Sequence, residues 1–245
     1  MSSGYYAACT GMMARTQALD TIANNLANGS TPGFKAIHNV FSSVLATTGE
    51  DPLSGLNIDA NDYGVLSGTR LDSSQGALEH TGNDLDVAME GPGYFAVQTA
   101  AGPVYTRGGN FKVSPQMQLV TAAGDPVLGD NGPITVAGGK VSISEDGTIT
   151  ANGAISGRLK LVEFPSSAQV QGTGGTYYTA PAGAAAAAKT SKVRQGMLES
   201  SNVNPVSSVV ELITAQRELE AMRRVLTMFS SEMDKAAAQD LPHVG

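Results

Sequence analysis

The sequence lacks tryptophan altogether and has a single cysteine, Cys9, among its 245 residues. A lone cysteine excludes an internal disulfide and a zinc site built from several thiolates, so we interpret Cys9 as a small residue on a helix. Only 15% of the residues are charged and 5% are aromatic, whereas glycine occurs 29 times. This composition is more typical of a chain with many turns and short strands than of a compact helical enzyme.

The chain also lacks a basic cluster and a long apolar run. Its formal net charge is −7, which argues against nucleic acid as a partner. No run approaches the ~18 apolar residues that a membrane helix needs, so we expect no membrane insertion. The N-terminus has no basic stretch followed by a continuous apolar one, so we expect any export to leave the N-terminus uncleaved.

Motifs for catalysis or ligand binding are equally scarce. Residues 91–96 match G-x-G-x-x-A in form, but a dinucleotide site needs a helix after that loop, and here a β-prone run follows. Asp146-Gly147 lacks the alternating ligands of a calcium loop, so we interpret it as a β-turn. The three histidines, His38, His80 and His243, are scattered. We therefore predict no enzymatic activity, no catalytic residue, no metal site and no cofactor.

Both ends of the chain have the apolar period of a helix. The first is predicted from about Ser3 to Ala27, and its apolar stripe comprises Tyr5, Ala8, Met12, Leu19, Ile22 and Leu26. The second is predicted from Pro205 to Gln239, with a heptad seam of Leu212, Ala215, Leu219, Met222, Leu226, Phe229 and Met233. Each stripe alone could belong to an amphipathic helix on a globular core. Because the longest helical patterns lie at opposite ends of a chain with little helix between them, we predict that they pack as a coiled coil, within one subunit or between neighbours.

The middle of the chain, from about residue 64 to 164, predicts β structure. Short β-prone runs alternate with Gly-rich turns at 94–98, 104–106, 111–113, 118–120, 141–143, 148–150 and 159–162. This spacing is typical of a sandwich or a distorted barrel. Residues 46–62 are polar and turn-rich, and residues 166–190 are of low complexity, so we expect both stretches to be loosely structured.

These patterns together predict an α+β fold. Long N- and C-terminal α-helices form a coiled coil, and an all-β domain, a sandwich or distorted barrel, lies between them along the chain. The expected organisation is a helix and turn at residues 1–35, an extended connection at 36–80, the all-β domain at 81–165, a low-complexity return segment at 166–198, and the C-terminal helical part at 199–245.

Four blocks of sequence together resemble the flagellar rod and hook protein family. Residues 22–35 (IANNLANGSTPGFK) resemble the family's I-A-N-N-L-A-N-x-x-T-P-G-F/Y-K signature. Residues 85–95 and 105–111 resemble its D-L-A-I-x-G-x-G-F-F and Y-T-R-x-G-x-F blocks. Glu199 begins a match to E-x-S-N-V-N, the segment that opens the family's C-terminal helix and that here supplies Ser201, Asn202, Val203 and Asn204. The blocks occur in family order and span nearly the whole chain.

The resemblance implies a structural subunit of the flagellar basal-body rod, located in the periplasm and exported by the flagellar type III apparatus. Its partners would be copies of itself and other rod proteins. The resemblance also implies that the terminal helices form a coiled-coil inner domain, with the central all-β domain outside it. Residues 132–136 and 157–162 are similar to proximal-rod members, which we favour over distal-rod members. The sequence departs from the family pattern at Gly29 and across the Ala-rich stretch 166–190. We also expect the terminal helices to be largely disordered in the free monomer and to fold on assembly.

Two alternatives come from other classes of protein. The first is a secreted β-rich binding protein or adhesin whose helices merely oligomerise it. The second is an enzyme acting on peptidoglycan, which would need a carboxylate pair from Asp84, Asp86 and Glu90.

The segment after the first helix has three interpretations: a helix stop, a glycosylation acceptor at Asn28, and a ligand-holding loop. We interpret it as a bend. Asn28 and Gly29 suit a left-handed helix cap, and Thr31-Pro32-Gly33-Phe34 suits a type II turn with a positive φ at Gly33. On this basis Gly33→Val is predicted to impair assembly more than folding of the β domain.

Overall fold

The computed structural model describes residues 2–42, 65–165 and 170–239. It divides the chain into two compact units. The first comprises residues 1–26, 37–70 and 205–245, and the second comprises residues 27–36 and 71–204. The chain therefore passes between the units more than once, and each unit is described by itself below.

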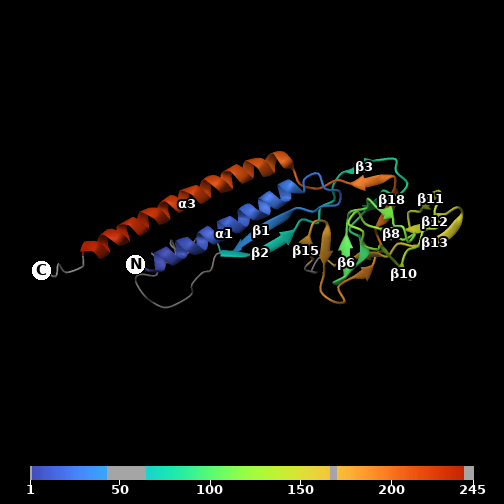
Figure 1. The fold of residues 1–245 in the computed structure, drawn as a ribbon, viewed down its shortest axis with the longest axis horizontal. Coiled ribbons are helices and arrows are strands. Elements are labelled where there is room, and N and C mark those ends of the chain that lie inside the picture. The colour runs from blue at the N-terminus through green and yellow to red at the C-terminus, as the bar shows by residue number, and fades with distance from the viewer. Residues whose placement is uncertain (1, 43–64, 166–169, 240–245) are drawn as a thin grey trace. The chain divides into compact units, whose positions relative to one another are not determined.

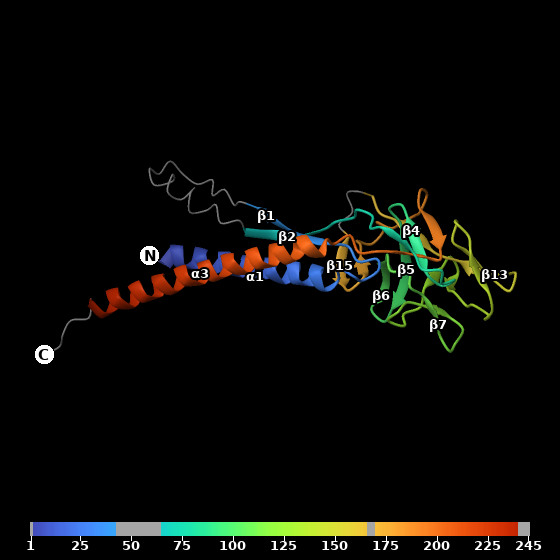
Figure 2. The same cartoon turned by 90° about the horizontal axis from the view of Figure 1, so that it is seen from above.

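The first unit contains the two long helices and a small sheet. Helix α1 spans Ser2–Ala27 and helix α3 spans Pro205–Gln239, which confirms both predicted helices. The two lie side by side and run in opposite directions (Figures 1 and 2). Strands β1 (Ile37–Ser42) and β2 (Val65–Leu71) form a two-stranded sheet. Neither described helix is long and apolar enough to cross a membrane.

Strand β1 packs against α1 through polar groups. The Asn25 amide donates to the Ile37 carbonyl oxygen at 2.7 Å, and the Ile37 backbone N–H donates to Asn25 Oδ1 at 2.9 Å. Thr21 Oγ1 lies 3.1 Å from Asn39 Oδ1. The side chain of Asn25 therefore pairs with the edge of β1 much as another strand would, which fixes the position of β1 along the helix.

The second unit is all β in the described residues. Its strands are β3 (Leu78–His80), β4 (Val87–Glu90), β5 (Tyr94–Thr99), β6 (Gly102–Thr106), β7 (Lys112–Val113), β8 (Leu119–Val120), β9 (Leu128–Gly129), β10 (Gly132–Pro133), β11 (Val141–Ile143), β12 (Thr148–Ala151), β13 (Ala154–Arg158), β14 (Leu161–Glu163), β15 (Gln171–Gly174), β16 (Tyr177–Thr179), β17 (Ala186–Ala187), β18 (Lys192–Gln195) and β19 (Met197–Glu199). The largest sheet has the order β15-β16-β6-β5-β14-β17, and a second has the order β11-β12-β13. Strands β4 and β3 pair with β18 and β19, near the other end of the unit's chain.

The core of this unit is built from short strands in which buried and exposed side chains alternate. In β11 and β12, for example, every second side chain is buried, as expected for strands with one face on a core. The main cluster comprises Val87, Met89, Phe95, Phe111, Leu119, Val127, Ile134, Val136, Val141, Ile143, Ile149, Ala151, Leu159 and Val193. A smaller cluster joins Tyr94, Val162 and Tyr178.

The predicted α+β class and central β region are confirmed, and so are the hairpins at 94–106 and 141–151. The expectation of a loose connection at 166–190 is wrong for its described part. Strands β15 and β16 join the six-stranded sheet there, and Tyr178 is fully buried. Composition misled the prediction, since two tyrosines supply burial that the surrounding glycines and alanines do not. The other predicted loose stretch, 46–62, lies outside the described residues.

Candidate functional site

The carboxylate of Glu199 lies at the meeting point of three segments of the second unit. Its Oε1 accepts hydrogen bonds from Lys35 Nζ at 2.5 Å and from the Gly76 backbone N–H at 2.9 Å. Its Oε2 accepts one from Arg107 Nη1 at 3.1 Å. The side chains of Lys35, Arg107 and Glu199 are each at most 1% exposed, and we call these three the Glu199 cluster.

Backbone approaches bring these segments together. The Gly33 N–H donates to the Glu199 carbonyl oxygen at 2.7 Å. A Cβ on Gly76 would lie 1.9 Å from the Ser200 carbonyl oxygen, so only glycine fits at that position. Lys35 Nζ also donates to the Ser74 carbonyl oxygen at 2.6 Å. Residues 33–35, 74–76 and 199–200 are thus held by main-chain contacts as well as by charge.

Asn202 extends the same connection a few residues further along the chain. Its Oδ1 accepts from the Ala36 N–H at 2.7 Å, and its Nδ2 donates to the carbonyl oxygens of Asp72 and Ser74 at 3.1 and 3.2 Å. Val203 packs with Phe34 and Ala36 in a small buried cluster. The S-N-V-N residues therefore hold together the segments near 36, 72 and 203, where the chain enters or leaves this unit.

Aromatic side chains enclose the Glu199 cluster. The Arg107 guanidinium lies 4.8 Å from the centre of the Tyr94 ring, a cation–π contact. The Tyr178 hydroxyl accepts from the Lys35 backbone N–H at 2.9 Å and donates to the Gly33 carbonyl oxygen at 3.2 Å. Burial raises the pKa of both tyrosines, although the charge of Arg107 opposes the increase. Both hydroxyls therefore stay protonated at neutral pH.

The cluster joins two buried cations to one contacting carboxylate. Burial lowers the pKa of Lys35, while its hydrogen bond and its attraction to Glu199 oppose the decrease. Removing one partner of such a buried pair costs about 3–5 kcal/mol because an uncompensated charge remains. These buried, hydrogen-bonded ion pairs hold the segments that carry Lys35, Arg107 and Glu199 in fixed positions.

Beyond residue 208, and among the side chains that the structure describes, only the predicted seam of α3 is buried or half-buried. Leu212, Leu219, Met222 and Leu226 are half-buried and Ala215 is buried. Across the pair of helices, Arg15 Nη1 of α1 lies 2.8 Å from Glu218 Oε2. The side chains of Phe229 and Met233 lie outside the described ones.

The predicted stripe of α1 is half-buried at Met12, Leu19, Ile22 and Leu26, and the side chains of Tyr5 and Ala8 lie outside the described ones. Four other residues of α1 are more deeply buried: Gly11, Ala14, Ala18 and Asn25. Sequence reasoning missed them because it looked for large apolar side chains. Their three-, four- and seven-residue spacing was a readable signal that a second element packs closely on this helix.

Outside its seam, α3 carries large apolar side chains that are exposed. Val209, Val210 and Ile213 lie near its start, and Val225 and Met228 lie farther along, all between 41% and 62% exposed. At 100° per residue these five fall away from the seam, with charged residues such as Arg217 and Arg224 between them. We call these five apolar residues the outer face of α3.

The turn after α1 agrees with prediction in one part and not in another. Gly33 has φ +73°, and the Phe34 N–H donates to the Thr31 carbonyl oxygen at 3.2 Å, as a type II turn over 31–34 requires. The predicted left-handed cap is wrong, since neither Asn28 nor Gly29 has a positive φ. Instead, the Thr31 N–H bonds the Asn28 carbonyl oxygen at 3.1 Å in a tight turn that needs no left-handed residue.

The weaker chemical motifs have structural roles. Gly93 lies so close to Ser191 that a Cβ would be 2.6 Å from its Oγ, so the Gly-rich stretch before β5 admits a neighbouring segment. Asp146 accepts from the N–H and hydroxyl of Thr148 in the β11–β12 turn. No group of three or more acidic, His or Cys side chains suited to a metal ion occurs in the described residues.

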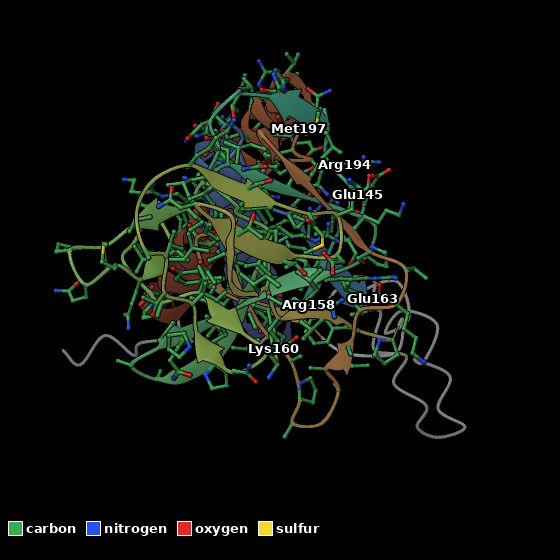
Figure 3. The ribbon with its side chains drawn as sticks, turned by 90° about the vertical axis from the view of Figure 1, so that its right-hand side faces the viewer. Glu145, Arg158, Lys160, Glu163, Arg194 and Met197 are labelled. Atoms are coloured by element: carbon green, nitrogen blue, oxygen red, sulfur yellow. The ribbon has the colours of Figure 1, made fainter. Side chains whose placement is uncertain are left out.

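Two of the three carboxylates considered for peptidoglycan chemistry, Asp86 and Glu90, are engaged by other side chains. Glu90 Oε2 binds Arg194 Nε at 2.7 Å, and Arg194 also binds Glu145 at 2.9 Å on the surface (Figure 3). Asp86 accepts from Asn83 Nδ2 at 3.1 Å. These contacts occupy the two groups in surface ion pairing and in a turn.

The chain is similar to flagellar rod and hook proteins. Family models match at residues 6–35 (flagella basal body rod protein), 88–151 (flagellar hook protein FlgE/F/G D1 domain) and 194–240 (flagellar basal body rod FlgEFG protein C-terminal). The basal-body rod protein FlgF of Salmonella typhimurium is 37% identical, over 94% of this chain and 96% of its own. FlgF of Caulobacter vibrioides is 33% identical over 98% of both chains. FlgG of Bacillus subtilis is 32% identical over 93% and 95%.

Proposed function

The chain belongs to the flagellar basal-body rod and hook protein family, and we propose that it is a structural subunit of the rod in its proximal part. The support is near-complete coverage by FlgF relatives at 32–37% identity. The FlgG relatives, at 30–32% identity, make a distal-rod subunit the second candidate. Its partners would be copies of itself and other rod proteins, and its place the basal body.

The outer face of α3 is the observation that carries this proposal. A helix that buries one side needs polar residues on the other, yet Val210 and Met228 are 59% and 62% exposed there. Burying the remaining exposed part of such side chains against neighbours is favourable by roughly 1–2 kcal/mol each. We infer that α1 and α3 of several subunits pack as a coiled-coil inner tube. Contacts between unlike faces would extend such an assembly into a filament instead of closing a ring.

The Glu199 cluster suits the same role. A subunit of a shaft that transmits torque needs segments that are held rigidly within each of its units. Within the second unit, the Gly33 N–H donates to the Glu199 carbonyl oxygen and the Ala36 N–H donates to Asn202 Oδ1, and together with the buried ion pairs of Glu199 these bonds hold the segments near residues 33–36 and 199–202. We propose a mechanical role for these residues and no catalytic one.

Export by the flagellar type III apparatus, with the N-terminus uncleaved and the rod located in the periplasm, remains part of this proposal. It rests on the family relationship and on helices that need neighbours. A secreted adhesin would carry its specific motifs on exposed β loops. Here the family's motif residues Lys35, Arg107, Glu199 and Asn202 lie around one joint.

The test is a charged substitution on the outer face of α3. Ile213→Glu should leave the circular dichroism of the purified chain unchanged but exclude it from isolated basal bodies and abolish swimming. Gln216→Glu is the matched control, since it adds the same charge at an exposed polar position of the same helix. Normal incorporation of Ile213→Glu would refute packing through this face.

A further inference from the structure

We propose that the second unit folds into its closed form only when residues 192–204 have joined it, because Lys35 and Arg107 must pair with Glu199. We call this role of Glu199 the latch. The latch is a property of the chain in solution and goes beyond the role in the rod. The latch means that the whole unit cannot fold until the last part of its sequence, residues 192–204, is present. The latch rests on the pairing of the strands, the order of the charges along the chain, and the cost of burying them.

Strands from early in the sequence of the second unit pair with strands from the end of its sequence. Strand β18 pairs with β4 from Lys192↔Glu90 to Gln195↔Val87, and β19 pairs with β3 from Met197↔His80 to Glu199↔Leu78. Val193 and Val87 belong to the main core cluster. Without residues 192–199, two early strands lose their hydrogen-bonding partners and the core loses a buried side chain.

The charges follow the same order. Lys35 and Arg107 come first in the chain, and Glu199, the carboxylate that contacts both, comes 164 and 92 residues after them. Asp72 also attracts Lys35, but Glu199 accepts hydrogen bonds from both cations. A chain that ends, or is held extended, before Glu199 has both cations and lacks the group that joins them.

Burial then decides which state such a chain adopts. The three side chains are at most 1% exposed in the closed unit, and burying a cation without its partner is strongly unfavourable. Until Glu199 is present, the free energy of hydrating Lys35 and Arg107 therefore outweighs the free energy gained by closing the unit, and the unit stays open. Under the export route proposed above, the latch would keep an incompletely delivered chain from closing its β unit, although the latch itself does not depend on that route.

The experiment cuts the full chain at an inserted protease site between Ala182 and Gly183, which are both exposed. The N- and C-terminal pieces of the purified protein are then separated in urea and remixed. Hydrogen exchange of the β5 and β6 amides reports closure of the second unit. We expect the N-terminal piece alone to exchange like an unfolded chain and to regain protection with the C-terminal piece.

Variants of the C-terminal piece separate charge from mere presence. Glu199→Gln should lower protection on remixing by about 100-fold or more, whereas Lys192→Gln, at a pair whose lysine is 59% exposed, should restore it as the wild type does. Adding Lys35→Met to the N-terminal piece should recover part of the loss with Glu199→Gln, since one uncompensated cation is then removed.

Two results would overturn the latch. One is protection of β5 and β6 in the N-terminal piece alone, and the other is full recovery with Glu199→Gln. Neither would affect the proposed role in the rod, which is tested by the Ile213→Glu variant. Equally, incorporation of Ile213→Glu into basal bodies would leave the latch standing.

Discussion

Gly33 lies against Gly108 so closely that a Cβ on Gly33 would be 2.2 Å from the Gly108 backbone nitrogen. The bend in the family's N-terminal signature is therefore packed into the second unit, beside Arg107 of the Glu199 cluster. The expectation that Gly33→Val would impair assembly more than folding does not agree with this contact. A side chain there meets main chain, which cannot move aside, so we now expect the folding of the second unit to suffer first.

We predict that Gly33→Ala destabilises the second unit by about 3 kcal/mol or more, because a positive φ and a clash with main chain add together. The measurement is urea unfolding followed by hydrogen exchange of the second unit. Gly124→Ala is the control, since Gly124 has φ +94° and a Cβ added there would meet nothing within 4 Å. This control should cost only about 1 kcal/mol. Equal losses in the free energy of unfolding for the two variants would show that the structure shifts to relieve the clash, and this would contradict the prediction.

Tyr178→Phe is predicted to cost about 1–3 kcal/mol, because it leaves the buried Lys35 N–H without its acceptor. Tyr105→Phe, at a half-buried ring in the same sheet, should cost much less. Thermal unfolding of the two variants compares them directly. The exchange rate of the Lys35 amide should rise in the first variant only, and an unchanged rate there would contradict the assigned hydrogen bond.

Glu163 is predicted to make stability depend on pH in the acid range. Partial burial raises its pKa, but hydroxyl and amide donors of Ser191 and Thr190 outweigh this and lower the pKa from 4.5 to about 2. The carboxylate therefore stabilises the fold fully above pH 4.5, and the contribution disappears as pH falls toward 2. Because the group is partly solvated, we expect about 1 kcal/mol.

Carbon-13 NMR of the Glu163 carboxyl group measures this pKa directly. Replacing both hydroxyl donors, in Thr190→Val with Ser191→Ala, should return it toward 4.5 while leaving the two backbone donors in place. A midpoint near 4.5 in the unaltered protein would mean that these contacts do not persist in solution.

The terminal helices are predicted to depend on neighbours for most of their stability. Isolated helices are marginal in water, and one face of α3 remains exposed at Ile213 and Val225 in the single chain. Circular dichroism of the free monomer should therefore give less helix than α1 and α3 together contain, and the helix content should rise on assembly. Fully formed and stable helices in the monomer would contradict this prediction.

The sequence determined the local structure of this protein. Helix periods located α1 and α3, and alternation with Gly-rich turns located the hairpins at 94–106 and 141–151. Those patterns are readable because each depends on residues a few positions apart. The four motif blocks indicated the family from the sequence alone, since their order along the chain is itself information.

What the motif residues do was decided only by the tertiary structure. Lys35, Arg107 and Glu199 stood in separate blocks, and nothing in their spacing showed that they share one buried cluster. The contact between Lys35 and Glu199 spans 164 residues, and strand β16 formed from a stretch whose composition suggested a loose connection. Long-range burial, which pairs charges and orders weak strands by excluding water, is a property of the folded chain and leaves no local period to read.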